Sequence, residues 1–229
     1  MTRTAGQHLR PLTVVGNDRE SETRTPARAL HPIPPDALDA YSPCPPLPSF
    51  RLGGEADLTR IAPGRPPADG TKIRISGRIL DGDERPARRV LMEIWNCNAY
   101  GRYSHTDDVG SKEAKLDPNF HGFGRLMTDD DGRFCFWTIK PAAYIARPDI
   151  GWWRPPHVHY SILGGGVRLV TQMYFPGDAL NERDFIYLAI PEPDRPLALA
   201  IPAGAEAGVP GFRFDMVVRG RHQTPPDRD

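Results

Sequence analysis

The sequence predicts an all-β protein, a β-sandwich of two antiparallel sheets with long functional loops and an extended N-terminal arm. Two observations predict this class. The 229 residues include 26 prolines and 22 glycines, which interrupt helices and separate short strands. From residue 72 onward, short segments alternate apolar and polar residues between turn sequences, and no helical pattern repeats. A chain of this length can form one sandwich domain with a single core.

Three strands are expected before residue 142. The segment KIRISGRIL, residues 72–80, alternates at period two, which fits a strand with one buried face. The turn DGDERPA leads from it into a second strand within RRVLMEIWNC, residues 88–97. An acidic Gly turn opens DDDGRFCFWTIKP, residues 129–141, and a third strand follows that turn.

Four further strands are expected after residue 150. They are HVHYSIL at 157–163, RLVTQMYF at 168–175, FIYLAI at 185–190 and GFRFDMVVRG at 211–220. Turn signals separate these segments, and a series of short strands spaced in this way is typical of a sandwich.

The composition changes at about residue 70. Residues 1–70 are polar and proline-rich, so we expect an extended arm that makes subunit contacts, with scattered apolar anchors such as Tyr41 and Phe50. Residues 71–229 are expected to form the sandwich domain. An insert at residues 98–124, rich in Gly, Tyr, His and Asp, separates two of its strands, and long loops of this kind are often functional.

Charge and composition exclude several classes of protein. Lys+Arg and Asp+Glu both total 29, so no nucleic-acid partner is expected, since such partners normally require a basic excess. The apolar runs are too short to cross a membrane, and no secretory signal pattern is seen. Three widely spaced cysteines, Cys44, Cys97 and Cys135, form neither a disulfide framework nor a zinc motif, which favours a cytoplasmic protein.

Two of the seven histidines, His157 and His159, lie two apart in WWRPPHVHY. In a strand their side chains project on the same side, where two imidazoles can bind one metal ion, although such a pair can equally be exposed strand residues. A cupin-type barrel would require a Glu shortly after the pair and a further His downstream, but no Glu follows the pair in HVHYSILGGGVR. A copper/zinc sandwich would require more histidines at strand positions, but the other five lie in expected loops or tails.

Tyrosines are the remaining candidate donors. Tyr103 and Tyr144 both lie in expected loops beside strands. A phenolate is a hard anionic ligand that suits a hard trivalent ion. Two tyrosinates with two neutral imidazoles would make a non-haem ferric site, whereas each ring taken alone could be a half-buried tyrosine whose hydroxyl forms a hydrogen bond.

Several longer motifs, in this order, resemble the intradiol ring-cleaving dioxygenases, and most of all their iron-bearing β subunits of the protocatechuate type. The resemblance covers about residues 72–220. The motifs are MEIWNCNAYGRYSH, LDPNFHGFGRLMTDDDGRFCFWTIKPAAY, WWRPPHVHYSI, TQMYFPGD and FRFDMVVRG.

This resemblance implies a ferric site and a reaction. The family's Fe(III) ligands fall on Tyr103, Tyr144, His157 and His159, and Tyr144 is the ligand expected to leave the metal when substrate binds. The implied reaction opens a catechol-type ring, of protocatechuate or a related substituted catechol, between its two hydroxyl-bearing carbons with O2. The product is a cis,cis-muconate-type diacid. Residues 71–229 would then be the catalytic domain, assembled with a homologous α subunit that lacks the metal ligands.

The resemblance also implies the residues around the metal. The family's catalytic arginine falls on Arg154, a glutamine lining its pocket on Gln172, and its pocket tryptophan on Trp95. Two positions depart from the pattern, since Ala146 replaces a tryptophan and Asp18 or a neighbour replaces a tyrosine of the family's N-terminal arm. Both departures concern the substrate pocket, so ring cleavage is better supported than any one catechol. The resemblance assigns no role to the pair Trp152-Trp153, which the sequence leaves unexplained.

Two alternatives remain open from the sequence. One is a catechol or hydroxyquinol 1,2-dioxygenase that works as a homo-oligomer with the same four ligands. Such enzymes usually begin with a helical dimerisation domain, which the proline-rich first 70 residues do not resemble. The other is a non-catalytic structural sandwich subunit, which would be expected to have lost some of the ligands.

Overall fold

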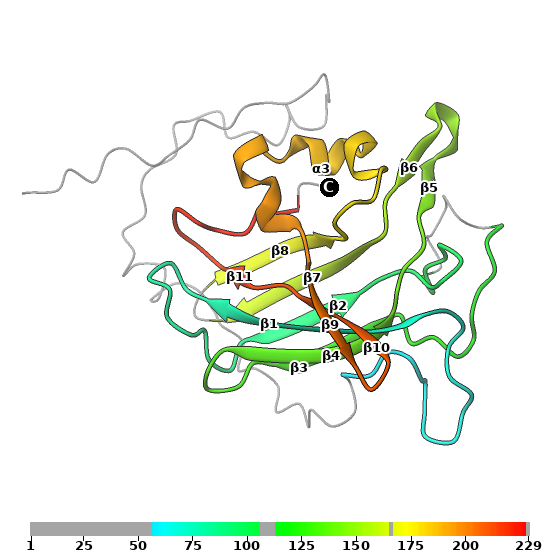
Figure 1. The fold of residues 1–229 in the computed structure, drawn as a ribbon, viewed down its shortest axis with the longest axis horizontal. Coiled ribbons are helices and arrows are strands. Elements are labelled where there is room, and N and C mark those ends of the chain that lie inside the picture. The colour runs from blue at the N-terminus through cyan, green and yellow to red at the C-terminus, as the bar shows by residue number, and fades with distance from the viewer. Residues whose placement is uncertain (1–55, 106–112, 165–166, 228–229) are drawn as a thin grey trace, which may run out of the picture. The chain divides into compact units, whose positions relative to one another are not determined.

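The computed structural model describes residues 56–105, 113–164 and 167–227, and the predicted arm residues 1–55, with Asp18 and Cys44, lie outside these ranges. Strands make up most of the regular structure of the described chain (Figure 1), which confirms the predicted all-β class. Its strands are β1 (Lys72–Leu80), β2 (Leu91–Trp95), β3 (Phe123–Met127), β4 (Arg133–Ile139), β5 (Tyr144–Arg147), β6 (Trp152–Arg154), β7 (His157–Gly164), β8 (Val167–Tyr174), β9 (Ile201–Glu206), β10 (Val209–Arg213) and β11 (Met216–Val217). Its helical turns are α3 (Phe185–Ala189) and the 3-10 segments η1 (Pro148–Ile150), η2 (Asn181–Arg183) and η3 (Glu192–Ala198).

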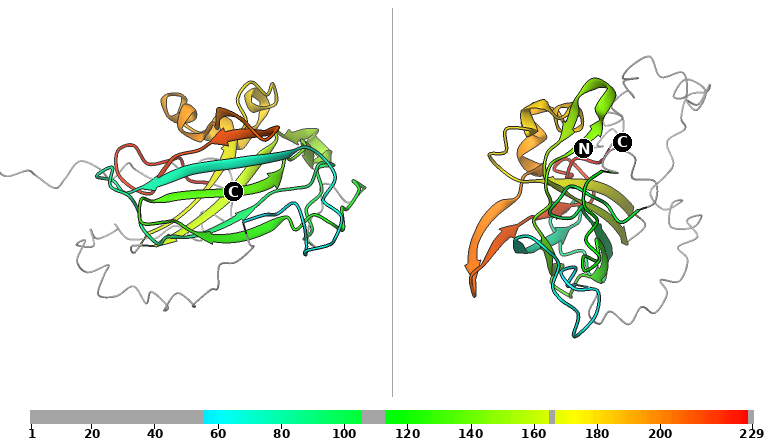
Figure 2. Two further views of the ribbon diagram at one scale, coloured as in Figure 1. Left: turned by 60° about the horizontal axis from the view of Figure 1, so that its bottom comes forward. Right: turned by 90° about the vertical axis from the view of Figure 1, so that its right-hand side faces the viewer.

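Two larger sheets form the sandwich. A five-stranded sheet contains β1, β4, β9, β10 and β11, and a four-stranded sheet has the order β3-β2-β7-β8. Neighbouring strands are antiparallel, except that β1 runs parallel to β10 and β11. Figure 2 shows the strands of one sheet in front of those of the other. The hairpin β5-β6 makes a separate two-stranded sheet that stands beyond them.

The core lies between the two larger sheets because each strand places alternate side chains there. In β1, residues such as Ile73 and Ile75 are fully buried, and they meet Ile94 of β2 and Tyr160 of β7 in one cluster. Gly77 continues the inward row of β1, where a Cβ atom would lie 2.0 Å from the carbonyl oxygen of Phe214. A side chain at this position would therefore push β1 away from the segment between β10 and β11.

Residues 56–70, which fall within the predicted arm, pack on the sandwich. Leu58 and Ala68 belong to the same core cluster. The Leu58 N–H donates to the Trp137 carbonyl at 2.9 Å, and the Trp137 N–H donates to the Ala56 carbonyl at 2.8 Å. The polar composition of this segment therefore does not prevent a few apolar residues from anchoring it to β4.

The prediction of a strand at residues 185–190 is wrong. The segment FIYLAI forms the short helix α3, because Asp184 directly before it caps the helix by accepting a hydrogen bond from the Tyr187 N–H. Tyr187 is buried against Tyr174 of β8, while Phe185 and Leu188 are exposed. An apolar run this short has no periodicity that separates helix from strand.

Other differences concern strands that the sequence pattern did not reveal. The strands β3, β5, β6 and β9 were not expected, and GFRFDMVVRG divides into the end of β10 and β11. β9 is exposed along its whole length and β6 has three residues, so neither has the alternation that marks a half-buried strand. Cys97 is buried and Cys135 is partly buried. Within the described ranges, no helix is long and apolar enough to cross a membrane.

Candidate active site

The candidate site lies on the face of the β3-β2-β7-β8 sheet that points away from the core. Along β7, Val158 and Tyr160 belong to the core cluster, so the alternating residues His157 and His159 project from the opposite face. Both histidines are nevertheless buried, with 1% and 7% of their surface exposed. The outer face of β7 is therefore covered by other parts of the chain, and its histidines do not lie on an open sheet surface.

Cross-strand register assembles a row of three predicted residues. Trp95 of β2 lies opposite His159, and His159 lies opposite Gln172 of β8. Residues paired in this way share one face of the sheet. The Trp95 indole stacks on the His159 imidazole, with ring centroids 4.9 Å apart and an interplanar angle of 4°. Sheet pairing alone therefore brings the predicted pocket tryptophan and glutamine to the second histidine.

The two imidazoles point at one spot. Their Nε2 atoms are 3.1 Å apart. Nδ1 of His157 lies 2.6 Å from the Pro155 carbonyl oxygen, to which it donates, so Nε2 keeps its lone pair. Burial, followed by the charges of His159 and Arg154, holds the pKa of His157 well below its ordinary value of 6.5. His157 is therefore neutral, which is the form that binds a metal.

The Tyr103 hydroxyl meets both imidazoles. Its oxygen lies 3.3 Å from Nε2 of His157 and 3.1 Å from Nε2 of His159. The Tyr144 ring is perpendicular to that of Tyr103 at a centroid distance of 5.5 Å, and it lies 5.8 Å from the His157 ring. Burial, and then the neighbouring Tyr144, raises the pKa of Tyr103 well above 10. A phenolate at this position therefore requires a cation beside it.

A tight turn after β2 brings Tyr103 to this place. The side-chain oxygen of Asn98 accepts two backbone N–H groups of the turn, at 2.9 and 3.0 Å. Gly101 has a φ of 78°, and a Cβ atom there would lie 2.9 Å from the Ala143 carbonyl oxygen. Glycine adopts this conformation and allows this approach without strain. The turn therefore packs directly against the start of β5, where Tyr144 lies.

The four gathered side chains suit a hard trivalent cation. They offer two phenol oxygens and two imidazole nitrogens, and the raised pKa of Tyr103 means that this phenol ionises only if a positive charge compensates it. In the described part of the chain, no group of three or more His, Cys, Asp or Glu side chains is arranged to bind a metal. Hard phenolate ligands favour a ferric ion over softer or divalent metals. The residues present therefore fit a non-haem Fe(III) ion.

Arg154 is buried next to this cluster, and the β5-β6 register places it opposite Tyr144. Its Nε lies 3.1 Å from Oδ1 of Asp184. Its Nη2 donates to Oε1 of Gln172 and, at 3.3 Å, to the hydroxyl of Tyr174. A planar guanidinium with partners on both ends has little freedom to rotate, so Arg154 presents a fixed positive charge.

The structure gives one of the two tryptophans beside Arg154 a role. Trp152 donates from Nε1 to Oδ1 of Asp184 at 3.2 Å, and its ring packs at 5.2 Å from that of Phe185. Trp153 is 46% exposed. Trp152 therefore helps to hold the carboxylate that pairs with Arg154, whereas nothing in the structure explains Trp153.

The sequence pattern did not predict a role in this site for three further residues. Tyr174 lies opposite His157 in the β7-β8 register, and its place two residues after Gln172 on an expected strand could have indicated it. Asp184 could have been recognised only as a helix cap, which requires that α3 be expected. Asp227 lies near the end of the chain in a segment without a strand or helix pattern, so no local signal marks it.

Of the two departures from the family pattern, the structure describes one. Ala146 is partly buried in β5, at the irregularity in pairing between Ile145 and Arg147. Its small side chain therefore stands two residues after Tyr144, on the hairpin that also holds Arg154.

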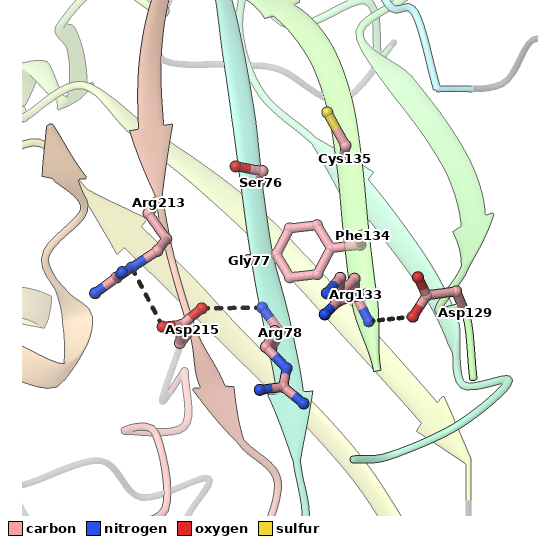
Figure 3. Close-up of a pocket in the computed structure, with 9 residues that line it drawn as sticks. All are labelled: Ser76, Gly77, Arg78, Asp129, Arg133, Phe134, Cys135, Arg213 and Asp215. Carbon is pink, nitrogen blue, oxygen red and sulfur yellow. Dashed lines mark hydrogen bonds and ion pairs between the residues drawn. The ribbon is translucent and has the colours of Figure 1, made fainter. Parts of the chain in front are cut away.

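A groove on the other sheet is distinct from this site. Figure 3 shows its charged side chains, among them Arg78, Arg213 and Asp215. Asp215 accepts the Arg78 backbone N–H at 3.0 Å and pairs with Arg213 at 3.3 Å. None of the seven predicted site residues lines this groove. The groups suited to metal chemistry are therefore gathered on the opposite side of the sandwich.

Comparisons with known proteins identify the family of this chain. A family model described as Dioxygenase matches residues 48–220. The protocatechuate 3,4-dioxygenase beta chain of Burkholderia cepacia is 41% identical over 224 residues, which cover 95% of this chain and 94% of that relative. The protocatechuate 3,4-dioxygenase alpha chain of the same species is 27% identical over 207 residues, which cover 88% and 95%.

A solved structure shares the fold as well. The 3-chlorocatechol 1,2-dioxygenase of Rhodococcus opacus 1CP matches with a TM-score of 0.57 and 26% identity, covering 72% of this chain and 65% of that one. The family model spans well over half of the chain, and the similarity to the beta chain extends over nearly all of it. The chain therefore belongs to the intradiol ring-cleaving dioxygenases.

Proposed function

We propose that this chain is the iron-bearing subunit of a non-haem Fe(III) intradiol dioxygenase, with Tyr103, Tyr144, His157 and His159 as the ligands. One observation carries the assignment: the Tyr103 hydroxyl lies 3.3 and 3.1 Å from the Nε2 atoms of the two histidines. All four ligands are present without substitution, which supports a catalytic subunit over a structural one. The 41% identity to a protocatechuate 3,4-dioxygenase beta chain supports the same assignment.

The reaction opens a catechol-type ring between its two hydroxyl-bearing carbons. Both atoms of O2 enter the product, a cis,cis-muconate-type diacid. When bound, a ferric ion supplies Lewis acidity toward the two substrate oxygens. The chain's residues then have to bind the catechol, accept its protons and stabilise the charge that develops on it.

Tyr144 and Arg154 perform the central steps. With a ferric ion bound, Tyr144 would be one of the residues that hold it until the substrate binds. Its phenolate oxygen would then accept one of the two catechol protons, and a hydroxide ion would accept the other. Arg154 stabilises negative charge on the substrate, because a fixed guanidinium in a site removed from water interacts strongly with developing charge. Gln172 holds Arg154 in place through its amide oxygen. Trp95 covers the face of His159 and lines the substrate pocket.

The substrate is protocatechuate or a related substituted catechol. The high identity to the protocatechuate beta chain favours protocatechuate. Ala146, two residues after Tyr144, leaves room that a bulkier side chain would fill, which favours a differently substituted ring. Oxygen uptake distinguishes these substrates when it is measured with protocatechuate, catechol, hydroxyquinol and sulfonated or bulkier catechols. A preference for catechol or hydroxyquinol would support a 1,2-dioxygenase instead.

A homologous α subunit is the proposed protein partner. The similarity of this chain to both a beta and an alpha chain of one species supports an assembly built from two related sandwiches. A cytoplasmic location is part of the proposal, and the thiol state of Cys97 and Cys135 fits a reducing compartment. Co-purification with a second chain of similar size tests the partner, and a pure, active homo-oligomer would contradict it.

The colour of the purified protein tests the ferric site. Charge transfer from tyrosinate to Fe(III) should give a burgundy to red-brown protein, with a broad visible band that shifts or bleaches when a catechol is added without oxygen. Admission of oxygen should then consume one O2 per catechol. A colourless protein that binds no iron would contradict the proposed function.

A further inference from the structure

The last described residues of the chain are docked on β8, close to the site. The Asp227 N–H donates to the Val170 carbonyl at 2.7 Å, and the Thr171 hydroxyl donates to the Pro225 carbonyl at 2.6 Å. Thr224, just before them, is buried. Hydrogen bonds of this kind, made by buried groups, fix the path of the segment. Asp227 therefore has a defined position, although it lies near the end of the chain.

The Asp227 carboxylate reaches two predicted site residues. Its Oδ2 accepts a hydrogen bond from Nε2 of Gln172 at 2.6 Å, and it lies 3.6 Å from Nδ1 of His159. The Asp227 side chain is only 6% exposed. The His159 Nδ1 atom is itself buried and has no hydrogen-bond partner among the described residues. The carboxylate therefore stands where this buried nitrogen needs an acceptor.

The two histidines thus differ in what supports them. Nδ1 of His157 donates to a backbone carbonyl, that of Pro155, at 2.6 Å. Nδ1 of His159 faces a carboxylate that comes from 68 residues further along the chain. A carboxylate beside Nδ1 keeps the proton on that nitrogen, leaves the Nε2 lone pair for a metal and makes the imidazole a stronger donor. A movement of a few tenths of an ångström would bring the pair within hydrogen-bond distance.

We propose that Asp227 is a positioning residue that holds the His159 imidazole in its metal-binding tautomer. This inference rests on the proposed function, since it assigns His159 as an iron ligand. The same carboxylate fixes the amide of Gln172, because the bond from Nε2 to Asp227 leaves Oε1 to accept from Arg154 and from the Tyr174 hydroxyl. Through His159 and Gln172, the Asp227 carboxylate therefore connects the proposed metal site with Arg154.

Iron retention tests the proposal on the full chain, purified with its iron and with its α partner where one is found. Asp227→Asn and Asp227→Ala should release iron to a chelator about 10–100 times faster than the parent protein. The visible tyrosinate band should shift because the His159 ligand is altered. Asp215→Asn is the control, since it makes the same change in an aspartate that accepts a backbone N–H and pairs with an arginine on the other sheet, away from the site. Its iron release and its band should be unchanged.

A second measurement needs no iron and separates this inference from the proposed function. In the metal-free protein, nitrogen-15 NMR of the histidine rings should show the proton on Nδ1 of His159, and Asp227→Asn should shift it toward Nε2. A parent protein without iron or colour would contradict the proposed function and leave this readout intact. Unchanged iron release in both variants, or the same His159 tautomer with and without Asp227, would overturn the proposal. If Asp227→Ala does not fold, iron release and the His159 tautomer of the near-isosteric Asp227→Asn variant test the proposal.

Gln172→Ala separates the two contacts of the carboxylate. It removes the amide that links Asp227 to Arg154 but leaves Asp227 beside His159. Turnover should therefore fall while iron release stays near that of the parent protein. If Gln172→Ala released iron as fast as Asp227→Ala, the carboxylate would not act on His159 directly and the proposal would fail.

Discussion

Arg154 and Asp184 form an ion pair that is almost completely removed from solvent. Nε and Oδ1 are 3.1 Å apart, and the two side chains are 4% and 0% exposed. The same carboxylate accepts a hydrogen bond from Trp152 and caps helix α3 by accepting the Tyr187 N–H. One buried aspartate therefore joins the proposed catalytic arginine to the β5-β6 hairpin and to the segment that follows β8.

Asp184→Ala should lower both stability and turnover. Removal of one partner from a buried ion pair leaves an uncompensated charge and typically costs about 3–5 kcal/mol of the free energy of unfolding. Arg154 would also lose the contact that orients it, so kcat should fall. Urea unfolding and oxygen-uptake assays measure the two effects. Asp149→Ala, which breaks an exposed pair with Arg147, should change stability little, and an equal loss in the two variants would contradict the buried-pair argument.

Arg154→Lys should reduce kcat without loss of iron. Lysine retains the charge but cannot donate to Asp184, Gln172 and Tyr174 from one rigid plane. We expect kcat to fall about 10²–10³-fold, the range found when one preorganised charge-stabilising donor is removed. Arg147→Lys, at the exposed end of the same hairpin, serves as control and should retain full turnover. Loss of iron from Arg154→Lys would show that the arginine supports the metal rather than the reacting substrate.

Tyr103→Phe should remove both colour and turnover. The variant deletes only the oxygen that lies 3.3 and 3.1 Å from the two Nε2 atoms, while the ring can still pack in its place. The visible band should weaken or move, and iron content should decrease. Tyr100→Phe changes an exposed tyrosine in the same turn, bonded to Asp69, and should leave colour and kcat intact. A Tyr103→Phe protein with full colour and activity would contradict the ligand assignment.

Acid should destabilise the metal-free protein through His157. Burial holds the pKa of His157 in the folded protein well below 6.5, whereas in the unfolded chain it titrates near that value. As the pH falls below 6.5, the unfolded chain takes up a proton that the folded protein does not bind. The free energy of unfolding should therefore decrease with falling pH, by at most about 1.4 kcal/mol per pH unit from this group.

Denaturant unfolding of the metal-free protein between pH 7.5 and 5 checks this expectation. His157→Gln cannot take up the proton, so its unfolding free energy should depend less steeply on pH than that of the parent protein. Parallel pH profiles for the two proteins would show that His157 does not contribute.

The sequence by itself determined the features that follow from local chemistry. Alternation along residues 72–80 predicted β1, and period two along HVHYSIL predicted that both histidines share a face. Motifs spread along the chain also indicated the family, and with it Tyr103 and Tyr144. These inferences depend on covalent spacing and on residue type, which do not change when the chain folds.

Only the tertiary structure decided which residues meet at the proposed metal site. Asp184 and Asp227 enter it from a helix cap and from the end of the chain, and Trp152 joins them through Asp184. The run FIYLAI became a helix because its cap and its burial against Tyr174, rather than its own periodicity, decide its conformation. Contacts between residues far apart in sequence depend on how sheets and loops pack, and no local pattern encodes that packing.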